Sequence, residues 1–204
     1  MQTDLILTRE IHQLPEPAAR GEHFTARQIH DSSDAASHTL DRFYTAEGFP
    51  DQWTAQLLKN GAQAVMICHD ELPVAAGWLI RKPFYIEEIR RTFDPGPTSD
   101  YYFGDFVAPA FRGKRLQRAL IRERLRLTHQ AGYRWATAIT RSTLPASLSS
   151  YSSEGFSVAV ALCKRVCLGM EWTRVCRVDR TRYCGQLSKE GLRLPFSSYL
   201  RLAR

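Results

Sequence analysis

Between residues 101 and 132 the sequence changes abruptly from a strand pattern to a helix pattern. Tyr101–Val107 is rich in aromatic residues, which favour extended strands, and Pro109 ends this run. A helix is predicted to open at Gly113 and to close at Gly132, with its leucines on one face and its arginines elsewhere. The chain therefore predicts a strand, a short loop and a long amphipathic helix in direct succession.

Such a junction is suited to bind an anion. The first backbone N–H groups of a helix have no partner within the helix, and the helix dipole adds roughly half a positive charge. Gly113 lets a ligand approach the backbone closely, and the flanking basic side chains add charge-assisted contacts. Arg112–Gln117 is therefore predicted to bind a phosphate or pyrophosphate, the alternative being a solvated basic helix start.

The net charge of +7 is concentrated at the same place. Between residues 112 and 126 a single acid, Glu123, stands among seven basic residues, and the rest of the chain is nearly neutral. The basic residues are Arg112, Lys114, Arg115, Arg118, Arg122, Arg124 and Arg126. An anionic ligand is expected here. A nucleic-acid-binding domain is the less favoured interpretation of this helix, because the sequence contains no recognised nucleic-acid motif.

The remaining sequence predicts a chain of mixed strands and helices. Strands are expected at 23–29, 63–69, 74–82, 101–107, 133–140, 156–163 and 172–178, and helices at 35–46, 53–58, 113–131 and 145–153. Residues 84–91 are interpreted as a short amphipathic helix. Residues 1–22 are predicted to be a poorly organised lead-in, 23–180 the domain, and 181–204 a basic C-terminal tail.

The junction resembles the acyl-CoA-binding motif of the GNAT superfamily of N-acyltransferases. The matching residues are Val107, Pro109, Phe111, Arg112, Gly113 and Leu120. Arg115 and Gln117 depart from the motif, since the family usually has Gly or Ala there. A second likeness lies downstream, where Tyr151, Gly155 and Phe156 match the end of a helix of that family. Leu144 stands where the family often has Asn.

This resemblance implies an α+β fold with a central mixed, mostly antiparallel sheet of about six to seven strands, flanked by helices on both faces. It also implies an acyl-CoA-dependent N-acyltransferase, with acetyl-CoA as donor and no metal. The donor would lie in a gap between the strands at 101–107 and 133–140. The residues implied to bind it are Phe106, Val107, Arg112, Gly113, Lys114, Arg115, Leu116 and Gln117.

The resemblance implies Tyr151 as a catalytic residue, and Asp105, two residues before Val107 on the same strand face, is the second catalytic candidate. An amine would attack the thioester carbonyl directly, and Tyr151 would protonate the leaving thiolate, since a phenol has a pKa near ~10 and a thiol near ~8.5. The alternative for Tyr151 is a core aromatic packed under Phe156. Asp105 is interpreted as the base, or else as a polar strand residue paired with an arginine. Glu87 and Glu88 would recognise a cationic amine, or would be solvated charges.

The acceptor is expected to be a small-molecule or protein amine, and the sequence does not identify it. Because of Arg115, Gln117 and Leu144, a catalytically altered GNAT-like protein that binds acyl-CoA as a sensor is the main alternative. No nucleic-acid partner is expected. No membrane partner is expected either, because no stretch approaches the ~18–20 apolar residues that span a bilayer. A homodimer stays open.

The compartment is predicted to be the cytoplasm, because the N-terminus lacks a basic region followed by an apolar core. The five cysteines include no CxxC pair, so reduced thiols and no metal site are expected.

Overall fold

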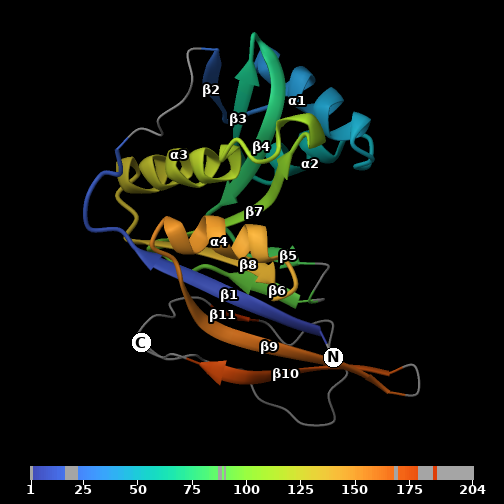
Figure 1. Ribbon diagram of the computed structural model, residues 1–204, viewed down its shortest axis with the longest axis vertical. Coiled ribbons are helices and arrows are strands. Elements are labelled where there is room, and N and C mark those ends of the chain that lie inside the picture. The colour runs from blue at the N-terminus through green and yellow to red at the C-terminus, as the bar shows by residue number, and fades with distance from the viewer. Residues whose placement is uncertain are drawn as a thin grey trace. The chain divides into compact units, whose positions relative to one another are not determined.

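A computed structural model describes residues 2–16, 23–86, 89, 91–167, 170–178 and 186–187, with side chains up to Cys163 (Figure 1). The chain divides into two compact units. The first contains residues 1–13, 81–101 and 128–204, and the second contains residues 14–80 and 102–127. Strand β7 (Ser99–Val107) begins in the first unit and ends in the second.

The first unit is built mainly from strands. Its strands are β1 (Gln2–Glu10), β5 (Phe84–Ile86), β6 (Arg91–Asp94), the start of β7, β8 (Trp135–Arg141), β9 (Ser157–Cys167), β10 (Met170–Val178) and β11 (Gln186–Leu187). The strand order is β10-β9-β1-β8-β7, while β11, β6 and β5 form a separate antiparallel sheet. Helix α4 (Pro145–Ser153) begins with proline at its first turn, as predicted.

The second unit has the strand order β7-β4-β3-β2, with β2 (Phe24–Ile29), β3 (Gln63–His69) and β4 (Leu72–Ile80). Its helices are α1 (Ala35–Ala46), α2 (Trp53–Lys59), the 3-10 helix η1 (Pro109–Phe111) and α3 (Leu116–Gln130). Asp34 caps α1 by accepting the amide hydrogen of Ala36 at 2.8 Å. Strands β3 and β4 form a hairpin, whose turn residues Asp70 and Glu71 both have positive φ.

The fold class is α+β, as predicted, and the larger sheet runs through eight strands in the described part of the chain, close to the expected six to seven. The pairs β1–β8, β1–β9, β9–β10, β2–β3 and β3–β4 are antiparallel. The amides of Arg134 and Trp135 both donate to the Thr98 carbonyl, at 2.9 and 3.0 Å. The starts of β7 and β8 therefore lie side by side, which makes this pair parallel and the sheet mixed.

Two segment predictions are wrong. Residues 2–10 are not a disorganised lead-in but the strand β1, which pairs with β8 on one side and β9 on the other. Pairing on both edges buries Ile6 and Leu7 and overrides the polar local composition. The helix expected at 84–91 is wrong at its described start, because Phe84–Ile86 is a strand that pairs with β6. Glu87 and Glu88 lie outside the described residues.

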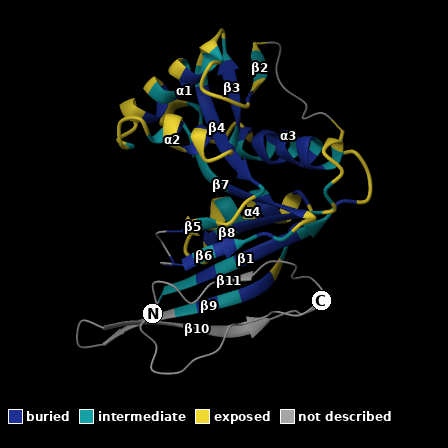
Figure 2. Cartoon of the chain, turned by 180° about the vertical axis from the view of Figure 1, so that it is seen from behind, coloured by how far each residue is buried: buried dark blue, intermediate teal, exposed yellow. Residues whose placement is uncertain are grey.

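In the second unit, helices cover both faces of the sheet. Neighbouring strand residues point to opposite faces, and β4 follows this rule. Trp78 packs against Tyr44 of α1 and Trp53 of α2, with ring centroids 6.1 and 5.7 Å away. A Cβ added to the adjacent Gly77 would instead lie 3.1 Å from Arg124 of α3. Figure 2 accordingly shows β3 and β4 buried, while α1 and α2 carry exposed residues.

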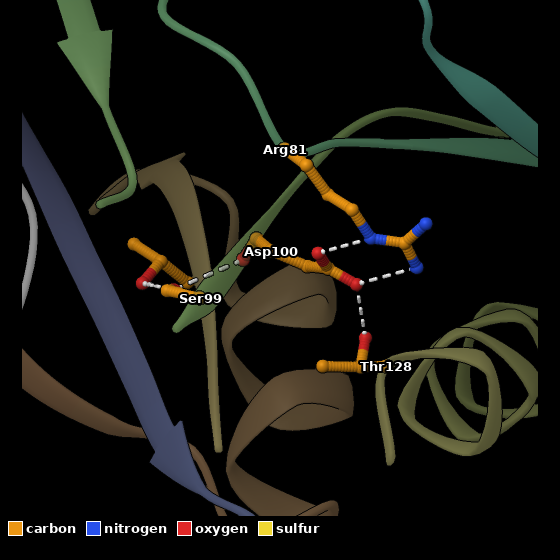
Figure 3. A network of polar contacts seen from close by, with 5 residues as sticks. Arg81, Ser99, Asp100 and Thr128 are labelled. Atoms are coloured by element: carbon orange, nitrogen blue, oxygen red, sulfur yellow. Dashed lines mark hydrogen bonds and ion pairs between the residues drawn. The ribbon is translucent and has the colours of Figure 1, made fainter. Parts of the chain in front are cut away.

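A buried carboxylate holds the start of β7 in the first unit (Figure 3). Asp100 is completely buried and accepts two hydrogen bonds from Arg81, at 2.9 and 3.3 Å. Thr128 donates a third at 2.7 Å. Burial raises the pKa of Asp100, while Arg81 and Thr128 oppose that shift.

The cysteines differ from one another. Cys68 is a buried free thiol whose pKa is raised by burial. Cys163 is disulfide-bonded, so the expectation that all five thiols are reduced is wrong. Within the described ranges, no helix is long and apolar enough to cross a membrane. The same residues contain no group of His, Cys, Asp or Glu side chains that would hold a metal.

Candidate functional site

The loop between β7 and α3 has two residues in the left-handed region of backbone conformation. Helix α3 begins at Leu116, three residues later than predicted, after η1 and a loop at 112–115. Gly113 has φ +79° and Arg115 has φ +59°. A Cβ added to Gly113 would meet no atom within 4 Å, so space is open beside this backbone. The amide of Ala119 donates to the Arg115 carbonyl at 3.2 Å, and earlier amides cannot bond within the helix.

The two departures from the GNAT motif are both accommodated here. Arg115 keeps the backbone conformation that glycine would adopt at the same position, at a cost of about 1–2 kcal/mol. Gln117 turns its side chain to β7, where Nε2 donates to Oδ2 of Asp105 at 3.4 Å. The loop is therefore compatible with a phosphate ligand, because neither residue closes the space beside Gly113.

The basic charge predicted for residues 112–126 is divided between the loop and the interior. Arg112, Lys114 and Arg115 are exposed. Arg124 is completely buried, and Arg126 donates to the Pro15 carbonyl at 3.0 Å. The exposed cations of this segment therefore gather at the start of α3 rather than along the helix.

Two loop side chains also make local contacts. The Arg112 Nε group donates to the Val107 carbonyl at 3.3 Å, which joins the loop to the end of β7. The Lys114 ammonium lies 4.9 Å from the ring centroid of Phe111. These contacts orient the two cations at the helix start.

Asp105 is paired with an arginine beneath α3. One of its carboxylate oxygens lies 2.6 Å from the Arg124 guanidinium, which also donates to the Trp78 carbonyl at 2.9 Å. The Arg124 guanidinium carbon lies 4.7 Å from the ring centroid of Tyr102. Of the two interpretations of Asp105, the arginine pair is present, and its role as a base stays a prediction.

The opposite face of β7 is aromatic. Phe106 packs against Phe43 and Phe49, with ring centroids 5.7 and 6.1 Å away. Gly104 has φ +62°, and an added Cβ would lie 2.8 Å from Trp78, so only glycine fits. Tyr102 faces Arg124, whereas Phe103 stacks on Trp78 and Gly104 faces the same ring. Two successive residues on one face indicate a β-bulge, which re-aims the strand from this point.

Tyr44 is a residue that the sequence analysis missed. Its hydroxyl donates to the Gly104 carbonyl at 2.9 Å, which fixes the bulge. Burial and the nearby charge of Asp105 raise the pKa of Tyr44, so the hydroxyl stays protonated. The available signal was its place beside Leu40 and Phe43 on the apolar face of the helix predicted at 35–46.

Tyr151 belongs to the first unit. It is 3% exposed and packs edge-on against Phe156, with centroids 5.0 Å apart. The core packing that was its alternative interpretation is therefore present, and its role as the acid stays a prediction. Leu144 is the N-cap of α4 and makes no side-chain cap bond.

No family model and no curated protein matches the sequence. Solved structures match its fold. A GCN5-related N-acetyltransferase from Sphaerobacter thermophilus has a TM-score of 0.58 and 12% identity, over 78% of this chain and 49% of the other. A GNAT-family acetyltransferase from Colwellia psychrerythraea has a TM-score of 0.53 and 18% identity, over 78% and 53%.

An aminoglycoside N-acetyltransferase in complex with CoA is similar over nearly its whole length. It has a TM-score of 0.51 and 18% identity, over 74% of this chain and 96% of the other. In contrast, the chain spans only about half the length of the Sphaerobacter and Colwellia structures. The strand order, the junction before α3 and these similarities agree that the chain has the fold of the GCN5-related N-acetyltransferases.

Proposed function

We propose that the protein is an N-acyltransferase that moves an acetyl or other acyl group from acyl-CoA to a primary amine. The observation that carries this proposal is the loop before α3. Its backbone is left-handed at Gly113 and Arg115, its exposed side chains are cationic, and it leads directly into the positive end of a helix. This combination suits a pyrophosphate better than it suits an extended nucleic-acid backbone.

Each part of the donor would have its own contacts. The backbone of Phe106 and Val107 would hold the thioester and pantetheine, because β7 ends at Val107 where the loop begins. The amides and side chains of Arg112–Gln117 would hold the pyrophosphate. Gln117 does not oppose this arrangement, since its side chain bonds to Asp105.

The reaction would be a direct transfer. The lone pair of a neutral amine forms the new C–N bond at the thioester carbonyl carbon, and the C–S bond breaks with its electron pair left on sulfur. The nitrogen gives up one proton, to Asp105 or to water, and the thiolate accepts one proton from Tyr151. The products are an N-acylated amine and free CoA.

The proposal also covers the partners of the protein and its compartment. The acceptor is a small-molecule or protein amine, without a nucleic-acid or membrane partner, and the protein acts in the cytoplasm. Of the tail predicted at 181–204, only Gln186 and Leu187 lie within the described residues.

The first test is calorimetric titration with acetyl-CoA, free CoA and desulfo-CoA. Saturable binding at one site per chain is expected for all three, since all carry the pyrophosphate. Absence of binding by all three would remove the donor site. Binding without turnover of any amine would favour the alternative function, an acyl-CoA sensor, for which the strained Arg115 is the motivating observation.

A matched pair of variants locates the site. The double substitution Arg112→Ala and Lys114→Ala removes two exposed cations from the loop and is expected to weaken acetyl-CoA binding at least about tenfold. The control, Arg42→Ala with Lys59→Ala, removes two exposed cations from α1 and α2 and should leave the affinity unchanged. Equal affinity in the two double variants would place the donor elsewhere.

A further inference from the structure

Aromatic residues form two layers on the α1–α2 face of the second unit. The inner layer, Phe43, Tyr44 and Trp78, is buried. The outer layer is only half-buried and consists of Phe49, Trp53 and Phe106, which we name the aromatic wall. Phe49 lies 4.9 Å from Trp53 and 6.1 Å from Phe106 between ring centroids, so the three rings adjoin one another.

The aromatic wall is held in place by the layer beneath it. Tyr44 packs edge-on against both Phe49 and Trp53, with centroids 4.9 Å away in each case. An added Cβ on Gly104 would come within 3.1 Å of Trp53, so Trp53 packs directly on the strand backbone. Gln52, which precedes Trp53, has φ +61° and provides no side-chain cap. The protein thus tolerates a strained residue at the position that directs Trp53 to the wall.

The described acids that adjoin the aromatic wall in sequence do not favour a polycationic acceptor. Asp105, the acid nearest to Phe106 in sequence, is bound to Arg124 on the opposite face of β7. Glu47 and Asp51 flank Phe49, but both are exposed. A polycationic acceptor would need buried or converging carboxylates to offset its desolvation. The wall offers ring faces instead, which favour aromatic and aliphatic groups and a single ammonium.

We propose that the acceptor is a primary amine that carries an aryl or similar apolar group, and that the aromatic wall binds this group. The inference rests on the proposed function. Phe106 links the two, because its ring belongs to the wall while its backbone belongs to the strand assigned to the thioester. An amine whose apolar group contacts Phe106 would therefore have its nitrogen beside the strand that presents the carbonyl. Because Asp105 faces α3 rather than the wall, the proton of this amine would leave through water.

The test compares amines of different chemistry by release of free thiol from acetyl-CoA. The probes are 2-phenylethylamine, hexylamine, spermidine and glycine. The kcat/KM for 2-phenylethylamine is expected to be at least tenfold above that for spermidine or glycine, with hexylamine between them. Preference for spermidine or glycine, with acetyl-CoA bound normally, would overturn the aromatic wall while leaving the proposed function intact.

Substitutions in the aromatic wall test whether these rings bind the acceptor. Phe49→Leu and Trp53→Leu are each expected to lower kcat/KM for 2-phenylethylamine at least fivefold, while the acetyl-CoA affinity and the far-ultraviolet circular dichroism stay unchanged. Glu47→Gln with Asp51→Asn is the control and should leave kcat/KM unchanged. A loss in the control variant with no loss in the leucine variants would assign acceptor binding to the carboxylates. If acetyl-CoA itself does not bind, the proposed function fails, and the acceptor assignment fails with it.

Discussion

Arg115 has a backbone conformation that glycine adopts at far lower cost. The penalty for an L-residue in the left-handed region is about 1–2 kcal/mol. Such strain persists only where surrounding structure imposes it, and it is concentrated at functional loops. Here the loop keeps the conformation of a glycine while gaining an exposed guanidinium at the start of α3. The charge of Arg115 is thus gained at some cost in stability.

The substitution Arg115→Gly tests this strain. We expect it to raise the free energy of unfolding by about 0.5–1 kcal/mol, because relief of strain exceeds the added entropy of glycine in the unfolded chain. Urea denaturation with an unchanged m-value would measure the gain. Gln52→Gly, at φ +61° at the N-cap of α2, is the control at a left-handed residue outside this loop and should be stabilised similarly. A loss of stability in Arg115→Gly would show that the left-handed turn is not strained.

One substitution can separate the packing of the Tyr151 ring from the chemistry of its hydroxyl. Tyr151→Phe keeps the edge-on contact with Phe156, so stability should change by less than about 1 kcal/mol. If the hydroxyl protonates the thiolate, kcat should fall about a hundredfold or more, with acetyl-CoA affinity unchanged. Steady-state kinetics together with calorimetry measure both. Wild-type kcat in this variant would reduce Tyr151 to a core residue.

Strand β7 presents different chemistry on its two faces. Asp105 faces Arg124 and Gln117 of α3, whereas Gly104 and Phe106 face the aromatic layers of α1 and α2. Asp105 therefore joins β7 to α3 twice, through its ion pair with Arg124 and through the hydrogen bond that Gln117 donates. Because movement of α3 would separate Arg124 from Asp105, this ion pair fixes the position of α3 on β7.

The substitution Asp105→Asn should lower the free energy of unfolding by about 3 kcal/mol, because it leaves Arg124 completely buried beside a neutral group. Adding Arg124→Met should recover much of that loss, since no uncompensated charge remains. Glu71→Gln, which breaks an exposed pair with Arg27 at 3.8 Å, is the control and should cost under about 1 kcal/mol. Equal effects of Asp105→Asn and Glu71→Gln would refute a buried pair.

Sequence patterns predicted the elements whose signals are local. The helices predicted at 35–46 and 145–153 begin at a capping Asp34 and at Pro145, and these signals lie within or directly beside the elements themselves. Strand β1 was missed because its pairing partners lie more than a hundred residues away. The same reason explains Tyr44 and Arg124, whose roles depend on contacts across elements. The strand–loop–helix junction at 101–130 was predictable because its three parts follow one another in sequence, while its phosphate role stays a prediction.

At the scale of the whole molecule, the basic residues behind the net charge of +7 differ in burial and in pairing. Arg124 is buried and Arg81 pairs with the buried Asp100. Arg112, Lys114 and Arg115 lie at the surface instead. Composition alone predicts a basic surface, and it cannot separate these groups because burial depends on the complete fold. The location of the charge therefore supports a discrete anion site more than a general affinity for polyanions.

The free energy of unfolding of the whole molecule depends on pH, and Asp100 sets the direction of one part of this dependence. Burial raises the pKa of this carboxyl in the folded protein above its ordinary value of 3.8, so the folded state holds the proton more tightly than the unfolded chain. The stability gained in this way is fully present below that ordinary value. It is lost as pH rises through the raised pKa of the folded state. Ionised Asp100 then relies on Arg81 and Thr128 for compensation.

Asp100→Asn removes this titration, and the two proteins should therefore diverge with pH. Measured by urea denaturation from pH 4 upward, the wild type should lose stability relative to Asp100→Asn as pH rises. The control Arg81→Gln removes the cation that opposes the shift, which should move the loss to higher pH and deepen it. If the wild type instead gains stability relative to Asp100→Asn as pH rises, Arg81 outweighs burial and the pKa of Asp100 is lowered. A difference independent of pH would mean that Asp100 keeps its ordinary pKa, and the buried network of Figure 3 would then have to be open to water in solution.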